Sequence, residues 1–247
     1  MLKYIFGHRS NYLNIKTIDE VQSLCRSVEK QINQVEFHEK LVQLFLHLSN
    51  RSINETPKDI LRQDWNFSLR KDLSQTHDQG VFLDYGRISA AGKIVAIYPG
   101  TIYHRTYDPL LLPSIRNQFL LARKDDFVID GRDRGLSRSI YLSCHSRSPR
   151  YDKTWLSHDI YLHQNPLTLG HYVNHFPQDT LPNVTYYEFD FAFHGKDSNL
   201  ERFIPHVRYA DIDDQDQSMP STILVSLRPI EKDEELFSCY LNLIVED

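Results

Sequence analysis

The sequence predicts an α+β protein in which a helical N-terminal part precedes a mainly β domain. Between about residues 17 and 49, apolar residues recur at spacings of three and four, the period of an amphipathic helix. From Gly80 onward, short runs of Val, Ile, Tyr and Phe alternate with Gly, Pro and Asp, as in short strands joined by turns. We therefore expect a helical extension over residues 1–76 and a mainly β domain over residues 77–247.

The first helix is expected to begin at Thr17. Thr17 and Glu20 have the spacing of a capping box, which satisfies the free amides of a helix start. The apolar stripe that follows consists of Ile18, Val21, Leu24, Val28, Ile32 and Val35, and continues with Leu41, Leu44, Phe45 and Leu48. The stripe slips in phase near Phe37, so the pattern allows either one kinked helix or two helices.

A further short helix is expected after Thr56-Pro57. Threonine is a good N-cap, and proline suits the first position of a helix because its missing amide would be unpaired there anyway. We interpret the helical part as an extension packed on the following domain rather than as an independent binding module.

The mainly β part contains several strand candidates, which are short apolar runs bounded by turn residues: 94–98, 119–122, 127–129, 184–193 and 222–227. The second and third of these flank Lys124-Asp125-Asp126 and predict a hairpin. Residues from about 136 to 166 show little periodicity and predict a long irregular insertion. The acidic run from Asp211 to Asp216 predicts a solvated loop.

The composition argues against several classes of protein. A hydrophobic content of 40% and an aromatic content of 12% are typical of an ordinary packed core. A net charge of -5 argues against a direct nucleic-acid binder, which usually has a basic surface. No apolar run approaches the roughly 18 residues that a membrane-spanning helix needs, and the N-terminus has no signal-peptide core, so no membrane association is expected.

The three cysteines, Cys25, Cys144 and Cys239, are isolated from one another in the sequence. No Cys-x-x-Cys pair or Cys/His cluster has the spacing of a zinc site, so no metal is expected. Unpaired thiols suit a reducing compartment, which indicates an intracellular protein, nuclear or cytoplasmic.

Two short segments near the C-terminus carry most of the functional information. Residues 169–175 read Leu-Gly-His-Tyr-Val-Asn-His, and residues 233–240 read Asp-Glu-Glu-Leu-Phe-Ser-Cys-Tyr. Matching segments accompany them: Gly-Val-Phe at 80–82, Tyr-Pro-Gly at 98–100, Val-Ile-Asp-Gly at 128–131 and Pro-Asn at 182–183. In this order and at these separations, the segments resemble the signature of SET-domain protein methyltransferases, over about residues 79–241.

The resemblance implies a fold of several small, curved sheets. In that fold the C-terminal segment passes under a loop of the preceding chain as a pseudoknot, which would bring the Asn-His segment and Tyr240 together. The implied activity is transfer of a methyl group from S-adenosyl-L-methionine to a lysine side chain of a protein or peptide substrate.

The resemblance also implies a cofactor site, made of Gly80, Val81, His171, Asn174, His175 and Tyr240. Gly80 has no side chain and would let the backbone of this strand approach the cofactor closely. Asn174 would hold the amino-acid end of the cofactor, and the backbone of His175 would pair with its adenine. His171 stands where the family usually has an arginine.

The implied catalytic residues are Tyr240, Tyr186 and Tyr98. A free lysine has a pKa of about 10.4 and must lose its proton before it attacks the methyl group. An aromatic channel disfavours the charged amine, while tyrosine hydroxyls orient the neutral one. Tyr240 would lie at the point of methyl transfer, and Tyr98 and Tyr186 would line the lysine channel. The alternative for these two strand tyrosines is a purely structural role in packing.

Departures from the family pattern leave a second function open. Asp78 replaces the first glycine of the Gly-x-Gly turn, and Ile97 and Thr101 replace acidic residues that often flank Tyr-x-Gly. The chain ends seven residues after Tyr240. The segment that closes the lysine channel in many members would therefore come from the insertion, the N-terminal helices or a partner, or be absent. The alternative function is a catalytically inactive SET-fold interaction module.

Overall fold

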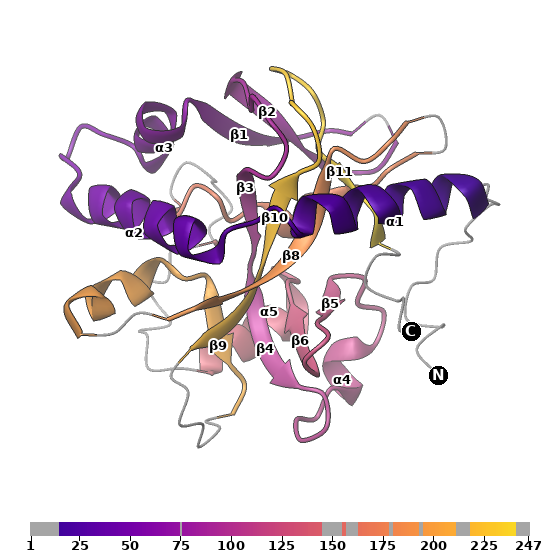
Figure 1. The fold of residues 1–247 in the computed structure, drawn as a ribbon. Helices are drawn as coiled ribbons and strands as arrows, with labels where there is room; N and C mark the ends of the chain where they lie inside the picture. Colours follow the sequence, from indigo (N-terminus) through magenta and orange to yellow (C-terminus); the bar gives the residue numbers. More distant parts are fainter. Residues whose placement is uncertain are drawn as a thin grey trace.

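The computed structural model describes residues 15–74, 76–144, 155–156, 163–177, 180–192, 195–210 and 218–240. Within them, three helices precede a series of mostly short strands, so the chain is a mixed α+β protein, as predicted (Figure 1). None of the described helices is long and apolar enough to cross a membrane. The acidic run 211–216 lies outside the described residues.

The N-terminal stripe forms two helices. α1 spans Ile15–Glu29 and α2 spans Gln34–Asn50. The chain turns between them, and the side chain of Asn33 caps α2 by accepting hydrogen bonds from two backbone amides of its first turn. α1 begins at Ile15, so the predicted start at Thr17 is wrong.

The buried face of these helices is narrower than the predicted stripe. Among the α1 side chains that the structure describes, residues 19–29, it consists of Val21, Cys25 and Val28. In α2 it consists of Phe37, Leu41, Leu44, Phe45 and Leu48. Leu24 is 41% exposed and Val35 is 66% exposed, so both stand outside the face. The reason is geometrical, because a helix turns by about 100° per residue and Leu24 lies to one side of the line through the three buried positions.

The third helix begins as predicted, but the strand after it was missed. α3, Pro57–Trp65, has Thr56 as N-cap in a capping box with Asp59, and Pro57 at its first position. β1, Phe67–Asp72, follows and pairs antiparallel with β2, Gly80–Gly86. The first half of β1, Phe-Ser-Leu, is buried, but the second half, Arg-Lys-Asp, is charged. Because of this charged half, the sequence of β1 does not show the pattern of a strand.

An ionic cluster joins α3 to the β1–β2 hairpin. The carboxylate of Asp84 lies 2.7 Å from Nζ of Lys58 and 2.9 Å from Nη2 of Arg62, and it accepts a hydrogen bond from Ser68 at 3.2 Å. Burial alone would raise the pKa of Asp84, but these donors outweigh it and hold that pKa below its ordinary value.

We expect Asp84 to make the stability of the protein depend on pH in acid. Because its pKa is lower in the folded state, its contribution is complete above the unfolded pKa of about 3.9 and is lost as the pH falls through the folded value. The free energies of unfolding of wild type and Asp84→Asn, measured with denaturant, should therefore differ by a constant amount from about pH 6 to about pH 4 and approach each other as the pH falls further, to about pH 3. Asp19→Asn, at an exposed position, is the control. A difference that stays constant over this range would contradict the assignment.

Two sheets form the centre of the mainly β part. β3 (Ile94–Tyr98), β10 (Met219–Ser226) and β8 (Val184–Phe191) make an antiparallel sheet in that order. β5 (Leu120–Ala122), β6 (Phe127–Asp130), β4 (Gly100–His104) and β9 (His206–Arg208) make a second sheet. The predicted hairpin around Lys124 is confirmed as the antiparallel β5–β6 pair.

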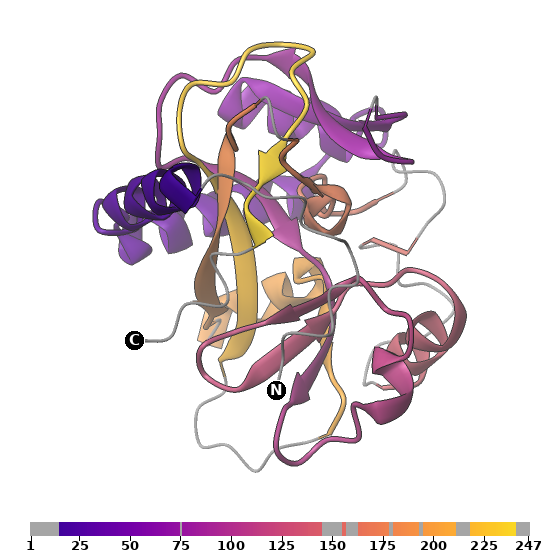
Figure 2. The same ribbon diagram turned by 90° about the vertical axis from the view of Figure 1, so that its right-hand side faces the viewer.

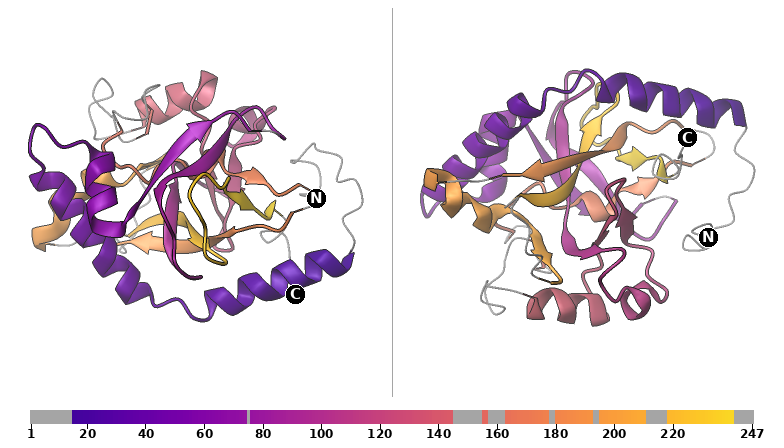
Figure 3. Two further views of the ribbon diagram at one scale, coloured as in Figure 1. Left: turned by 90° about the horizontal axis from the view of Figure 1, so that it is seen from above. Right: turned by 60° about the horizontal axis from the view of Figure 1, so that its bottom comes forward.

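The N-terminal helices pack on the β3–β10–β8 sheet. Figures 1 and 3 show α1 and α2 following one another along one side of the molecule beside this sheet. The ring of Phe45 in α2 lies 6.1 Å from that of Phe191 in β8 and 5.5 Å from that of Phe203. Phe203 ends the 3₁₀ segment η3, Gly195–Phe203. Burying one such side chain stabilises a fold by about 1.5–3 kcal/mol, so helices and sheet depend on each other.

Two short helices flank the second sheet: α4, Leu111–Ser114, and α5, Gly135–Ser143. α5 corrects the prediction of an irregular stretch over 136–166. Its buried residues, Ser137 and Tyr141, are one turn apart. Two positions, one of them polar, are too few to give a recognisable helical pattern in the sequence. Residues 145–154 and 157–162 of this stretch lie outside the described residues.

Candidate functional site

The two motif segments lie side by side. η2, Gly170–Tyr172, is followed by β7, Asn174–His175, which pairs in parallel with β11, Phe237–Ser238. Just before β11, the amide of Leu236 donates to the carbonyl of Val81 in β2 at 2.7 Å. The C-terminal segment therefore lies between β2 and β7 (Figure 2).

A buried asparagine fixes this segment in place. Asn183, just before β8, is 1% exposed. Its side-chain oxygen accepts from the amide of Phe237 at 2.8 Å, and its side-chain nitrogen donates to the carbonyl of Glu235 at 2.8 Å. The backbone amide of Asn183 also donates to the carbonyl of Phe237 at 3.0 Å. Asn183 of the Pro-Asn motif is thus a structural clamp on the C-terminal segment, a role that the sequence did not reveal.

We expect Asn183→Ala to lower the free energy of unfolding by about 2–4 kcal/mol, because it leaves the Phe237 amide and the Glu235 carbonyl without partners. Chemical denaturation monitored by circular dichroism measures this loss. Asn54→Ala, in an exposed turn, should change the same quantity by less than about 0.5 kcal/mol. If both variants lose equally little, Asn183 is not a clamp.

The side chain of Asn174 faces the loop between β1 and β2. Its nitrogen donates to the carbonyl of Gln79 at 2.7 Å and to Oε1 of Glu235 at 3.3 Å. Oε2 of Glu235 accepts from the hydroxyl of Ser74 in the same loop at 3.2 Å. A Cβ on Gly80 would lie only 2.1 Å from Oε1 of Glu235. Gly80 thus makes room for the Glu235 carboxylate, a contact that the sequence did not predict.

His175 and Tyr240 contact each other directly. Nδ1 of His175 accepts from the backbone amide of Tyr240 at 3.2 Å, and the two ring centroids are 5.4 Å apart. The Tyr240 hydroxyl donates to the carbonyl of Val173 at 2.9 Å. Burial raises the pKa of Tyr240 to about 12, and burial lowers the pKa of His175. Near neutral pH, Tyr240 is therefore a phenol and His175 a neutral imidazole.

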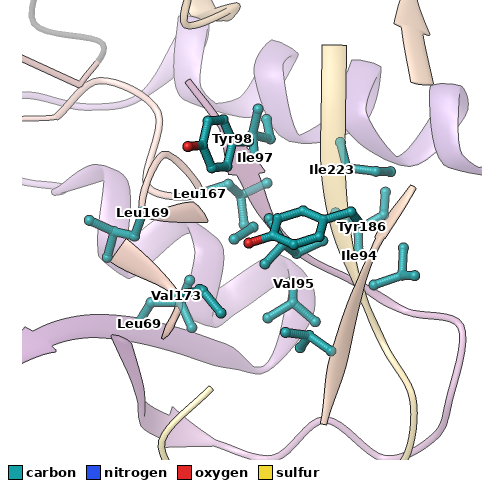
Figure 4. Packing of buried hydrophobic residues seen from close by; sticks show 14 of the residues in the cluster. Leu69, Ile94, Val95, Ile97, Tyr98, Leu167, Leu169, Val173, Tyr186 and Ile223 are labelled. Carbon is teal, nitrogen blue, oxygen red and sulfur yellow. The ribbon is translucent and has the colours of Figure 1, made fainter. Parts of the chain in front are cut away.

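The three predicted catalytic tyrosines form one row. The ring of Tyr186 lies 6.4 Å from that of Tyr240 and 6.2 Å from that of Tyr98. The hydroxyl of Tyr186 accepts from Ser238 at 3.1 Å, and that of Tyr98 donates to the carbonyl of Phe119 at 2.9 Å. Figure 4 shows Tyr98 and Tyr186 among apolar side chains, with their hydroxyls directed to the same side. Burial raises the pKa of both well above the ordinary tyrosine value.

His171 is enclosed by aromatic rings. It is 5% exposed, and its ring centroid lies 4.0 Å from Tyr172, 5.3 Å from Trp155 and 6.5 Å from Tyr98. Burial lowers its pKa to about 3, so the imidazole is neutral. Neither ring nitrogen has a hydrogen-bond partner within the part of the chain that the structure describes. Its contacts connect it to the tyrosine row.

The site therefore combines two environments. Asn174, His175 and Glu235 are half-buried polar groups that a ligand in solution can reach, while Tyr98 and Tyr186 are buried. In the described ranges, no group of three or more His, Cys, Asp and Glu side chains could hold a metal ion. The arrangement suits binding of a polar ligand beside a row of buried aromatic rings.

The site is a strand that ends in Asn-His and pairs with a tyrosine-bearing segment from far along the chain. Two curated relatives show the protein family to which a chain with this site belongs. One, from Pongo abelii, is 35% identical over 195 residues, which cover 76% of this chain and 68% of the relative. The chain belongs to the SET-domain family. Both relatives are SET domain-containing protein 9; the second, from Homo sapiens, is also 35% identical, with 62% of its length covered. No protein-family model matches the chain.

Membership of this family suggests a methyltransferase. The chain covers about two thirds of the length of these relatives.

Proposed function

We propose that the protein is an S-adenosyl-L-methionine-dependent methyltransferase that modifies a lysine side chain of a protein or peptide. One observation carries this proposal. The parallel β7–β11 pair brings Asn174 and His175 to Tyr240, at the end of the row that continues through Tyr186 to Tyr98.

The residues around Asn174 fit the amino-acid end of the cofactor. Oδ1 of Asn174 accepts no hydrogen bond from the described residues, and the side chain is half-buried, so the oxygen is available to a ligand. Gly80, Val81 and His175 would supply backbone contacts and Tyr240 a side-chain contact. When bound, the cofactor supplies a methyl group on a sulfonium. His171 would act on this site through the ring of Tyr98.

The tyrosine row fits a lysine side chain. Burial of the row disfavours the ammonium form of an entering lysine and excludes water. Since the pKa of each of the three hydroxyls is raised, they remain protonated and orient the neutral amine rather than remove its proton as a base. Alignment of the amine is the main task of a site for in-line methyl transfer.

We also propose that residues 77–247 form the SET domain, residues 1–76 a packed extension, and the C-terminal segment a pseudoknot. Hydrogen bonds from that segment to β2 on one side and β7 on the other support the threaded passage. Protein or peptide substrates, and not nucleic acid or membrane, are the proposed partners.

Calorimetry with S-adenosyl-L-methionine, followed by methyl transfer to peptide arrays, tests the proposal. We expect binding in the micromolar range and methylation of lysine. Absence of binding would overturn the proposal. Binding without any transfer would favour the second function, an inactive SET-fold interaction module. The observation in favour of that alternative is that the Tyr240 hydroxyl already donates to the carbonyl of Val173.

We expect a mainly monomethylated product, and higher di- and trimethyl fractions from Tyr186→Phe. The Tyr186 hydroxyl lies in the row and occupies space that a methylated amine needs in order to rotate into line. Mass spectrometry of one peptide at high conversion measures the distribution. Tyr187→Phe, at the next position of β8, is the matched control. Trimethylation by wild type, or an unchanged distribution, would show that Tyr186 does not limit the product.

A further inference from the structure

We propose that Glu235 is a positioning residue of the cofactor site, which orients Asn174 and selects the amino group of the bound ligand. This inference rests on the proposed function and adds to it which group of the cofactor's amino-acid end binds at Asn174. Three contacts of Glu235 carry it, with Asn174, Ser74 and Gly80.

The first step concerns the orientation of the Asn174 amide. The carbonyl of Gln79 and the carboxylate of Glu235 only accept hydrogen bonds, and both face the same atom of Asn174 at 2.7 Å and 3.3 Å. That atom must therefore be the NH2 nitrogen, whose two hydrogens are both used. The oxygen of the amide then faces away from Glu235, and it only accepts. A ligand group at this oxygen must be a donor, as an α-ammonium is and a carboxylate is not.

The second step concerns charge. Glu235 is half-buried, and no described lysine, arginine or histidine forms an ion pair with it. A carboxylate that lacks a counter-ion attracts a cation and repels an anion at the neighbouring Asn174 oxygen. Orientation and charge thus favour the same end of an amino acid, its ammonium group.

The third step concerns how the carboxylate is held. Ser74 donates to Oε2 from the β1–β2 loop, so Glu235 connects that loop to the Asn-His strand. Gly80 lies against Oε1, and a Cβ there would come within 2.1 Å of it. Gly80 has no positive φ, so alanine suits its backbone and acts mainly by pushing the carboxylate aside. This gives two independent ways to disturb one group.

The experiment compares two ligands on three variants by calorimetry. The ligands are S-adenosylhomocysteine and its analogue with hydrogen in place of the α-amino group. Glu235→Gln keeps the shape and removes the charge, whereas Gly80→Ala keeps the charge and displaces it. We expect each to weaken binding of S-adenosylhomocysteine about tenfold or more. Binding of the analogue should weaken less than about twofold in Glu235→Gln, and in Gly80→Ala it should weaken less than binding of S-adenosylhomocysteine does. Glu231→Gln, at an exposed glutamate nearby, should change neither.

Each other outcome is decisive. An equal loss for both ligands would show that Glu235 acts only on the structure of the site, and no loss would show that it is not part of the site. Either result overturns this inference while the proposed function stands. If wild type fails to bind S-adenosylhomocysteine, the proposed function itself is overturned and this inference with it. Thermal unfolding shows whether each variant is folded. If only one of Glu235→Gln and Gly80→Ala is folded, that variant is sufficient for the test.

Discussion

Replacing Asn174 by alanine is expected to weaken binding of S-adenosyl-L-methionine by about 10- to 150-fold, the equivalent of about 1.5–3 kcal/mol. The variant removes the amide oxygen that would accept from the charged end of the cofactor. It also leaves the carbonyl of Gln79 and the carboxylate of Glu235 without the donor that joins them. Isothermal titration calorimetry measures the change directly.

The comparison needs a folded variant and a neutral reference. Asn174 is half-buried, so its truncation should cost less stability than that of the fully buried Asn183. Asn54→Ala removes the same side chain from an exposed turn and should leave the affinity unchanged. Wild-type affinity in a folded Asn174→Ala protein would show that the cofactor is held elsewhere.

The parts of the fold that the sequence predicted are those that local rules decide. Thr56 and Pro57 start α3 because capping chemistry acts over a few residues. The β5–β6 hairpin follows from two apolar runs that flank a polar turn. β1 was not predicted because half of its residues are charged. It pairs only with β2, and such a strand can be stable with only part of its length buried. No local pattern distinguishes such a strand from a loop.

The site divides in the same way. The motif pointed to Asn174, His175 and Tyr240, and the structure brings them together. The contact of Glu235 with Asn174 spans 61 positions of the chain. Its packing on Gly80 likewise arises only when β2 and the C-terminal segment meet. From the sequence, Glu235 is predicted to lie in a solvated turn, because the sequence does not show that the β1–β2 loop will contact it.

Tyr240→Phe is expected to reduce the rate of methyl transfer about 100-fold or more while changing the stability little. The phenylalanine ring keeps the packing of Tyr240 against His175 and Tyr186. The lost hydrogen bond to the Val173 carbonyl is worth only about 0.5–1.5 kcal/mol to the fold. Single-turnover methylation of one peptide by both folded proteins measures the effect, with Tyr187→Phe as the control. Equal rates would make Tyr240 a structural residue and support the inactive interaction module.

The pH dependence separates two ways in which the hydroxyl can act. Burial raises the pKa of Tyr240 to about 12, so the hydroxyl stays protonated across the range in which the rate is measured. The rate of wild type should rise with pH because the lysine amine, with an ordinary pKa of about 10.4, loses its proton. If Tyr240 only orients that amine, Tyr240→Phe lowers the rate by the same factor at about pH 7 and at about pH 9. A factor that shrinks as the pH rises would instead show that Tyr240 takes part in removing the proton, contrary to its raised pKa.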